Sequence, residues 1–174
     1  PLASSSAASD VYKRQSLNLA FFGAAKLELA ENTKSIPKEL NQATKGFQAI
    51  GYRYGELLVE AFKARSLLNA NRLKQAEKQA LSALDLAEKL EAFDLIWRIA
   101  ALLGEAQAGQ KKMESAEASY RAAQLALEQA SGTLSSDRAR TRFGIGKSYI
   151  VQFLIDLDWQ QKNPSQLFED LERG

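Results

Sequence analysis

The sequence has 174 residues, a formal net charge of +2 at pH 7, and neither cysteine nor histidine. The missing residue types exclude disulfides, thiolate nucleophiles, imidazole bases and the usual zinc sites. The nearly neutral charge argues against nucleic acid as the main partner, and no run of 18 apolar residues is present that would span a membrane.

The chain begins with a stretch, SSAASDVYKRQ at residues 5–15, that does not read as part of a folded domain. Back-translated with ordinary codons, it resembles a transposase-type sequencing adaptor read in frame. We therefore treat residues 1–15 as a non-native, disordered tail, and expect a domain over residues 16–174 whose native N-terminus is missing. Lys13 and Arg14 belong to this tail, so the apolar LNLAFFGAA that follows them is not predicted to be a signal peptide. The lack of cysteine fits the cytoplasm, where we expect the protein to be located.

After this tail the composition favours helices throughout. Alanine, leucine, glutamate, lysine and glutamine dominate, β-branched residues are sparse, and the whole chain has only three prolines. The fold class is therefore predicted to be all-α, and linkers of a few residues predict that neighbouring helices pack as antiparallel pairs. Helices are expected over residues 17–31, 37–69, 72–90, 94–108, 112–130, 136–161 and 164–173.

Two of these helices repeat the same pattern. LKQAEKQALSALDLAEKL, from residue 73, aligns without a gap with MESAEASYRAAQLALEQA, from residue 113. The distance along the sequence from residue 73 to residue 113 is the same for every aligned position, and we call it the repeat offset. Small residues recur in the alignment, because two helices approach closely only where neither carries a large side chain. The matched pairs are Ala76 with Ala116, Ala80 with Tyr120, Ala83 with Ala123 and, on the preceding helices, Ala64 with Gly104.

The second copy of the pattern resembles a tetratricopeptide repeat. Leu103-Gly104 on one helix, and Ala116, Tyr120 and Ala123 on the next, match that family's pattern of small and aromatic residues. The resemblance implies a right-handed α-solenoid of about three helix pairs, with the third pair near the C-terminus. Ala100 and Gln107 depart from the aromatic positions, and the repeat offset is longer than the period usual in that family. A HEAT-type repeat and an ordinary helical bundle remain open alternatives.

The C-terminal segment suggests a more specific relative. SSDRARTRFGIGKSYIVQFLIDLDWQQKNPSQLFEDLERG looks like the closing helices that precede a CHAT domain in bacterial proteins. The resemblance implies a helical scaffold beside a caspase-like effector domain, whose catalytic His–Cys pair is absent from this chain. No activity is therefore carried over, and the chain is expected not to be an enzyme.

The other candidate motifs favour no chemistry. FGIGKS, from Phe143, lacks the first glycine of a phosphate-binding loop, because Thr141 stands in its place. Asp156 and Asp158 are two residues apart on an expected helix and so point in different directions. No cofactor, metal or small-molecule substrate is expected, although an enzyme that uses carboxylates alone stays an alternative.

The repeat register predicts a concave face built from the first helix of each pair. This face is the expected binding site for a protein or peptide partner, with no nucleic acid and no membrane involved. An alternative function is a ligand- or peptide-sensing segment of a bacterial signal-transduction or transcription regulator. The predicted concave residues are Leu58, Ala61, Arg65, Arg98, Ala101, Glu105, Tyr149, Gln152 and Asp156.

Overall fold

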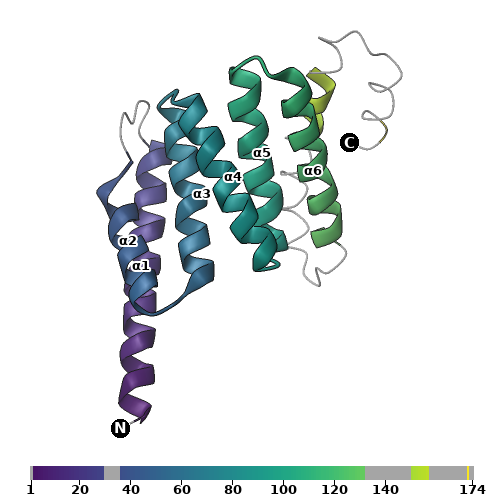
Figure 1. Ribbon diagram of the computed structural model, residues 1–174. Helices are drawn as coiled ribbons and strands as arrows, with labels where there is room; N and C mark the ends of the chain where they lie inside the picture. Colours follow the sequence, from purple (N-terminus) through teal and green to yellow (C-terminus); the bar gives the residue numbers. More distant parts are fainter. Residues whose placement is uncertain (1, 30–35, 132–149, 157–171, 173–174) are drawn as a thin grey trace. The chain divides into compact units, whose positions relative to one another are not determined.

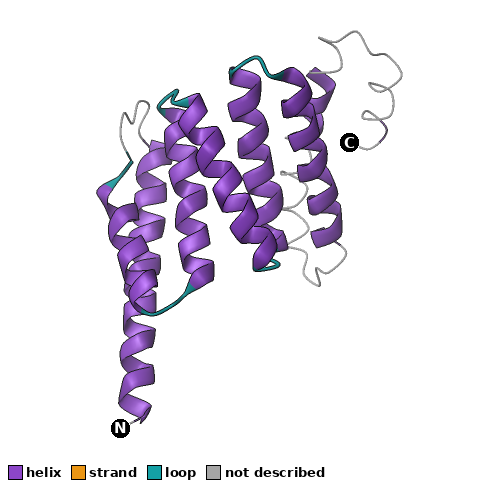
Figure 2. Ribbon diagram, in the orientation of Figure 1, coloured by secondary structure: helices purple, strands orange, loops and turns teal. Residues whose placement is uncertain are grey.

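The computed structural model describes residues 2–29, 36–131, 150–156 and 172 of the chain. These residues are helical apart from short connections, and no strand occurs among them (Figure 2). The predicted all-α class is thereby confirmed. The helices are α1 (Leu2–Leu29), α2 (Lys38–Ala49), α3 (Arg53–Asn69), α4 (Leu73–Lys89), α5 (Phe93–Gly109) and α6 (Met113–Ser131).

The chain divides into two units, Pro1–Leu90 and Glu91–Gly174. In the first unit α1 packs against α2, and α3 packs against α4 (Figure 1). Helix α3 also contacts both α1 and α2, so the second helix pair rests on the first pair through α3. In the second unit α5 and α6 form a further pair, and residues 150–156 add another helical segment.

The expectation of one helix over residues 37–69 is wrong. The chain turns at Gly51, which has a φ of +66°, and this turn separates α2 from α3. The Tyr52 N–H reaches back to the Phe47 carbonyl at 2.9 Å, which closes the end of α2. Glycine adopts this left-handed conformation without steric cost, and so stops a helix that the surrounding residues would otherwise continue. By contrast, α4, α5 and α6 each differ from their predicted bounds by one residue at each end.

The N-terminal tail also differs from expectation, because α1 begins at Leu2 instead of near residue 17. Neither proline nor glycine occurs between this residue and Gly23, so nothing in the sequence interrupts the helix. Its N-terminal half extends past α2 and α3 (Figure 1), and Val11 is 62% exposed. The Lys13 ammonium lies 4.2 Å from the centre of the Tyr52 ring. The non-native origin of residues 5–15 stays a prediction.

The turns between helices recur at a constant interval along the sequence. Positive φ angles occur at Gly51, Asn71, Glu91 and Lys111, and the next helix begins two residues after each of them. In the last of these turns the Lys112 N–H donates a hydrogen bond to the Gln107 carbonyl at 3.0 Å, and the Lys111 N–H donates one to the Ala108 carbonyl at 2.8 Å. This pair of bonds is a Schellman motif, which satisfies carbonyls left free at the helix end.

These turns predict opposite effects for two identical substitutions. Lys111→Gly should raise the free energy of unfolding by about 0.5–1 kcal/mol, since a non-glycine residue is strained at positive φ. Lys78→Gly, at an exposed position inside α4, should lower it by about 1 kcal/mol through the weak helix propensity of glycine. Urea unfolding of both variants measures the difference, and a loss of stability in both would contradict a strained turn at Lys111.

Candidate functional site

The contact between α5 and α6 is built around Gly104. A Cβ added to this glycine would lie 2.8 Å from Cε2 and 2.9 Å from Cδ2 of Tyr120 on the facing helix. The Tyr120 side chain is fully buried, and the Phe153 ring stacks on it with centroids 4.3 Å apart and planes 26° apart. The helical segment 150–156 is thus seated on the α5–α6 pair through an aromatic stack. The glycine provides the space that the tyrosine ring occupies.

The equivalent position in the first unit uses smaller side chains. Ala64 on α3 and Ala80 on α4 correspond to Gly104 and Tyr120, and both alanines are buried. The other repeated small residues, Ala76, Ala83, Ala116 and Ala123, are buried as well. A large residue is accommodated where its partner is glycine, and two alanines pack closely where no large residue is present.

The first helix pair, α1 and α2, was not predicted from the sequence as a repeat. Leu40, Ala43 and Phe47 on α2 precede Ala80, Ala83 and Ala87 by the repeat offset, and all six are buried. A Cβ added to Gly23 on α1 would lie 2.8 Å from Cδ2 of Leu40, a contact like that of Gly104 with Tyr120. The same offset would have revealed this pair, had the turn at Gly51 been recognised. The pair expected near the C-terminus lies largely outside the described residues.

Two polar contacts hold these helix pairs in register. In the second unit, the buried Ser119 hydroxyl donates to Gln107 Oε1 at 2.7 Å, which joins α6 to α5. In the first unit, Glu60 on α3 accepts hydrogen bonds from Gln79 on α4 and from Lys63 at 2.9 Å. Polar groups paired inside a helix contact disfavour sliding of one helix along the other, because sliding would leave them unpaired.

An ion pair joins α1 to α2 at the end of the first pair. Lys26 Nζ lies 2.5 Å from Glu39 Oε1, and the Glu39 side chain is only 7% exposed. The hydrogen bond from Lys26 lowers the pKa of the Glu39 carboxyl below its ordinary value of 4.5, with help from a backbone N–H. The ionised carboxylate is thus the form that the folded state favours.

This pKa shift predicts an acid-sensitive contribution to stability. A carboxyl whose pKa is lowered by folding stabilises the protein fully above its unfolded pKa, and this stabilisation is lost as the pH falls through the folded pKa. In Lys26→Met the free energy of unfolding should therefore fall less steeply than in the parent chain as the pH is lowered below about 5. Lys89→Met, which breaks an ion pair whose side chains are 67% and 65% exposed, is the matched control and should leave that slope unchanged. Urea unfolding at a series of pH values provides the comparison, and parallel profiles for the parent chain and Lys26→Met would contradict this role.

The predicted concave residues of the first unit share one face of α3. Leu58 and Arg65 are half-buried, and Ala61 lies between them, buried. Their spacing of three and four residues places them along one side of the helix. Because Ala61 is buried, the accessible part of this side consists of the half-buried side chains of Leu58 and Arg65.

In the second unit the predicted residues fall into two separate groups. On α5, Arg98 is exposed with its guanidinium carbon 4.5 Å from the centre of the Trp97 ring, and Glu105 is half-buried seven residues later. In the segment 150–156, the exposed Gln152 amide donates to Asp156 Oδ1 at 3.1 Å. Tyr149 lies outside the described residues. Of the predicted residues in this unit, the structure therefore brings Gln152 and Asp156 into contact.

The described residues include no group of three or more acidic side chains arranged to hold a metal ion. None of the helices in the described part of the chain is long and apolar enough to cross a membrane. No protein family model, curated protein or solved structure matches the chain.

Proposed function

We propose that residues 16–174 are part of a helical-repeat solenoid of the tetratricopeptide type, a non-catalytic scaffold that binds a protein or peptide. The observation that carries this proposal is the recurrence of small residues at helix contacts, each separated from the next by the repeat offset. Gly104 facing the buried Tyr120 is the most constrained of these contacts. The evenly spaced turns add support, since α3, α4 and α5, each with the turn that follows it, have the same length.

Peptide binding by this scaffold would use two of the predicted residues of α5 in the second unit, Arg98 and Glu105. Arg98 is exposed whereas Glu105 is half-buried, and the position of the Arg98 guanidinium over the Trp97 ring combines a cation with an aromatic surface. Such a pairing favours a ligand that carries a carboxylate next to an apolar side chain. The partner is accordingly a partly acidic peptide segment.

The scaffold is further proposed to position or regulate an attached CHAT-type effector domain, as the C-terminal resemblance implies. The alternative is a sensing segment of a bacterial signal-transduction or transcription regulator. The complete open reading frame from reads free of adaptor distinguishes the two. A downstream module with a His–Cys pair supports the effector, whereas an upstream helix-turn-helix or ATPase module supports the regulator.

Peptide selection tests the binding function directly. A displayed library of random peptides is selected on the whole chain, and the recovered peptides are measured against Arg98→Glu and against Arg72→Glu, an exposed arginine in the α3–α4 turn. We expect acidic, partly apolar peptides whose affinity falls about tenfold or more with Arg98→Glu, a loss of about 1.4 kcal/mol, and stays the same with Arg72→Glu. Equal binding to both variants would remove Arg98 from the site.

A further inference from the structure

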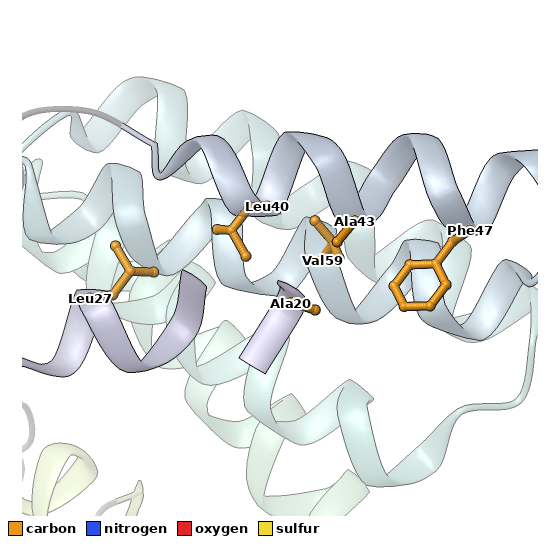
Figure 3. Close-up of a cluster of buried hydrophobic side chains, with 6 residues drawn as sticks. All are labelled: Ala20, Leu27, Leu40, Ala43, Phe47 and Val59. Carbon is orange, nitrogen blue, oxygen red and sulfur yellow. The ribbon is translucent and has the colours of Figure 1, made fainter. Parts of the chain in front are cut away.

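Helix α1 has apolar side chains on the side opposite its buried residues. The inward side carries Ala20 and Leu27, which are buried in the cluster shared with α2 and α3 (Figure 3). On the outward side, Phe21 and Phe22 are 56% and 57% exposed, and Ala25, one helical turn further on, is exposed as well. The helix therefore presents two large aromatic side chains to solvent, beyond those that it needs for its own packing.

The repeat offset relates this surface to the binding residues predicted on α3. The residues that precede those of α3 by one offset are all exposed, namely Asn18, Phe21 and Ala25. Ala61 on α3 is buried, whereas its equivalent on α1, Phe21, is exposed. The Phe21 ring meets the half-buried Phe62 ring of α3 edge-on, with centroids 6.3 Å apart. One apolar surface thus extends from α1 to α3, and a continuous apolar surface of this kind marks an interaction site.

Two cations border these rings, one on each helix. The Lys26 ammonium lies 4.7 Å from the centre of the Phe22 ring, where its ion pair with Glu39 holds it. The Glu39 side chain is 7% exposed whereas that of Lys26 is 45% exposed, so the cation is the member of the pair that is presented to solvent. On α3, Arg65 is half-buried and follows Phe62 by three residues, which places both on one side of that helix.

The charge of this surface favours an acidic partner. No aspartate or glutamate occurs at the positions of α1 and α3 that form it. Cations beside aromatic rings attract carboxylates, while the rings contact apolar side chains of the same ligand. A second copy of the chain that docked through the same surface would bring the same cations and no carboxylate. The surface therefore suits a ligand whose carboxylates lie next to large apolar side chains.

We propose that Phe21, Phe22 and Lys26 of α1, together with Phe62 and Arg65 of α3, form a docking surface for an acidic, partly apolar peptide. We call this set the aromatic surface. Apolar side chains of the peptide cover the phenylalanine rings, and its carboxylates contact the two cations. This inference rests on the peptide-binding function proposed above, but it adds a site in the first unit that uses none of the α5 residues.

Two fluorescein-labelled peptides test the aromatic surface by fluorescence anisotropy. One carries leucine and phenylalanine beside glutamates, and the other has glutamine in place of each glutamate. We expect the parent chain to bind the acidic peptide at least about tenfold more tightly. Phe22→Ala should weaken the binding of both peptides about tenfold, because their apolar side chains lose the ring. Leu81→Ala, on α4 and 50% exposed, is the matched control and should leave binding unchanged.

Arg65→Gln separates the contribution of charge from that of the rings. It should weaken binding of the acidic peptide about fivefold and leave that of the glutamine peptide unchanged, with Arg72→Gln as the exposed control. Arg98→Glu distinguishes this surface from the α5 site. Loss of binding with Arg98→Glu but not with Phe22→Ala would overturn the aromatic surface and leave the function proposed above standing. No binding of the acidic peptide to the parent chain, or equal binding of the two peptides, would also overturn it.

Three further measurements complete the test. The thermal midpoint of Phe22→Ala should lie within about 2 °C of the parent, because Phe22 is exposed, so that weaker binding does not reflect unfolding. A dimer of the parent chain that Phe22→Ala dissociates in sedimentation would overturn the proposal and assign the surface to a second copy. Vesicles of phosphatidylserine and phosphatidylcholine that bind the parent chain but not Phe22→Ala, with no binding of the acidic peptide, would overturn it in favour of a membrane.

Discussion

Gly104→Val is expected to lower the free energy of unfolding by about 3 kcal/mol. The first added carbon would already lie within 2.9 Å of three atoms of the Tyr120 ring, and two further methyl carbons add to the overlap. The ring has little freedom to move, since Tyr120 is fully buried and stacked against Phe153. The helices would have to separate instead, which loses contact along the whole α5–α6 pair. Urea denaturation followed by circular dichroism measures the loss.

A double-mutant cycle tests whether the tyrosine ring is the cause. Tyr120→Ala removes the ring and leaves space, so Gly104→Val in that background should cost less than about 1 kcal/mol. Gly109→Val controls for the helix propensity of valine, because Gly109 is exposed at the end of α5; we expect a change within about 0.5 kcal/mol. An equal cost of Gly104→Val with and without the ring would show that the contact does not depend on size complementarity.

The part of the fold that follows from local patterns was predictable from the sequence. The bounds of α4, α5 and α6 follow from amphipathic spacing and short breaks, and the shared alanine positions follow from the alignment of the two repeats. The boundary between α2 and α3 was missed because IGYRYG carries apolar and aromatic residues that continue a helical pattern. One glycine in a left-handed conformation ends α2. The three later turns place Asn71, Glu91 and Lys111 in the same conformation, so no single residue type marks these turns in the sequence.

The candidate site was predictable only as a set of positions on helices. Helical spacing groups Leu58 with Arg65, and Arg98 with Glu105, on one side of α3 and α5 respectively. The partners of individual side chains were not predictable, as the hydrogen bond from Gln152 to Asp156 and the position of Arg98 over Trp97 illustrate. These contacts depend on rotamers, which sequence spacing does not specify.

Phe47→Ala should lower the free energy of unfolding by about 4 kcal/mol, the largest effect expected of any single substitution here. The Phe47 ring is fully buried where α2 meets α3, with the Tyr52 ring centroid 5.6 Å away and the backbone of Gly55 close beside it. The side chain therefore supports both the packing within the first helix pair and the seat of α3 on that pair (Figure 3). Phe93→Ala is the matched control, since Phe93 is 48% exposed and its loss should cost about 1 kcal/mol or less.

Hydrogen exchange should become faster throughout α1, α2 and α3 in Phe47→Ala, because removing the ring loosens the contact that joins these three helices. Faster exchange confined to the ends of α2 would mean that α3 is held in place by other contacts, and the ring would then contribute only to its own helix pair.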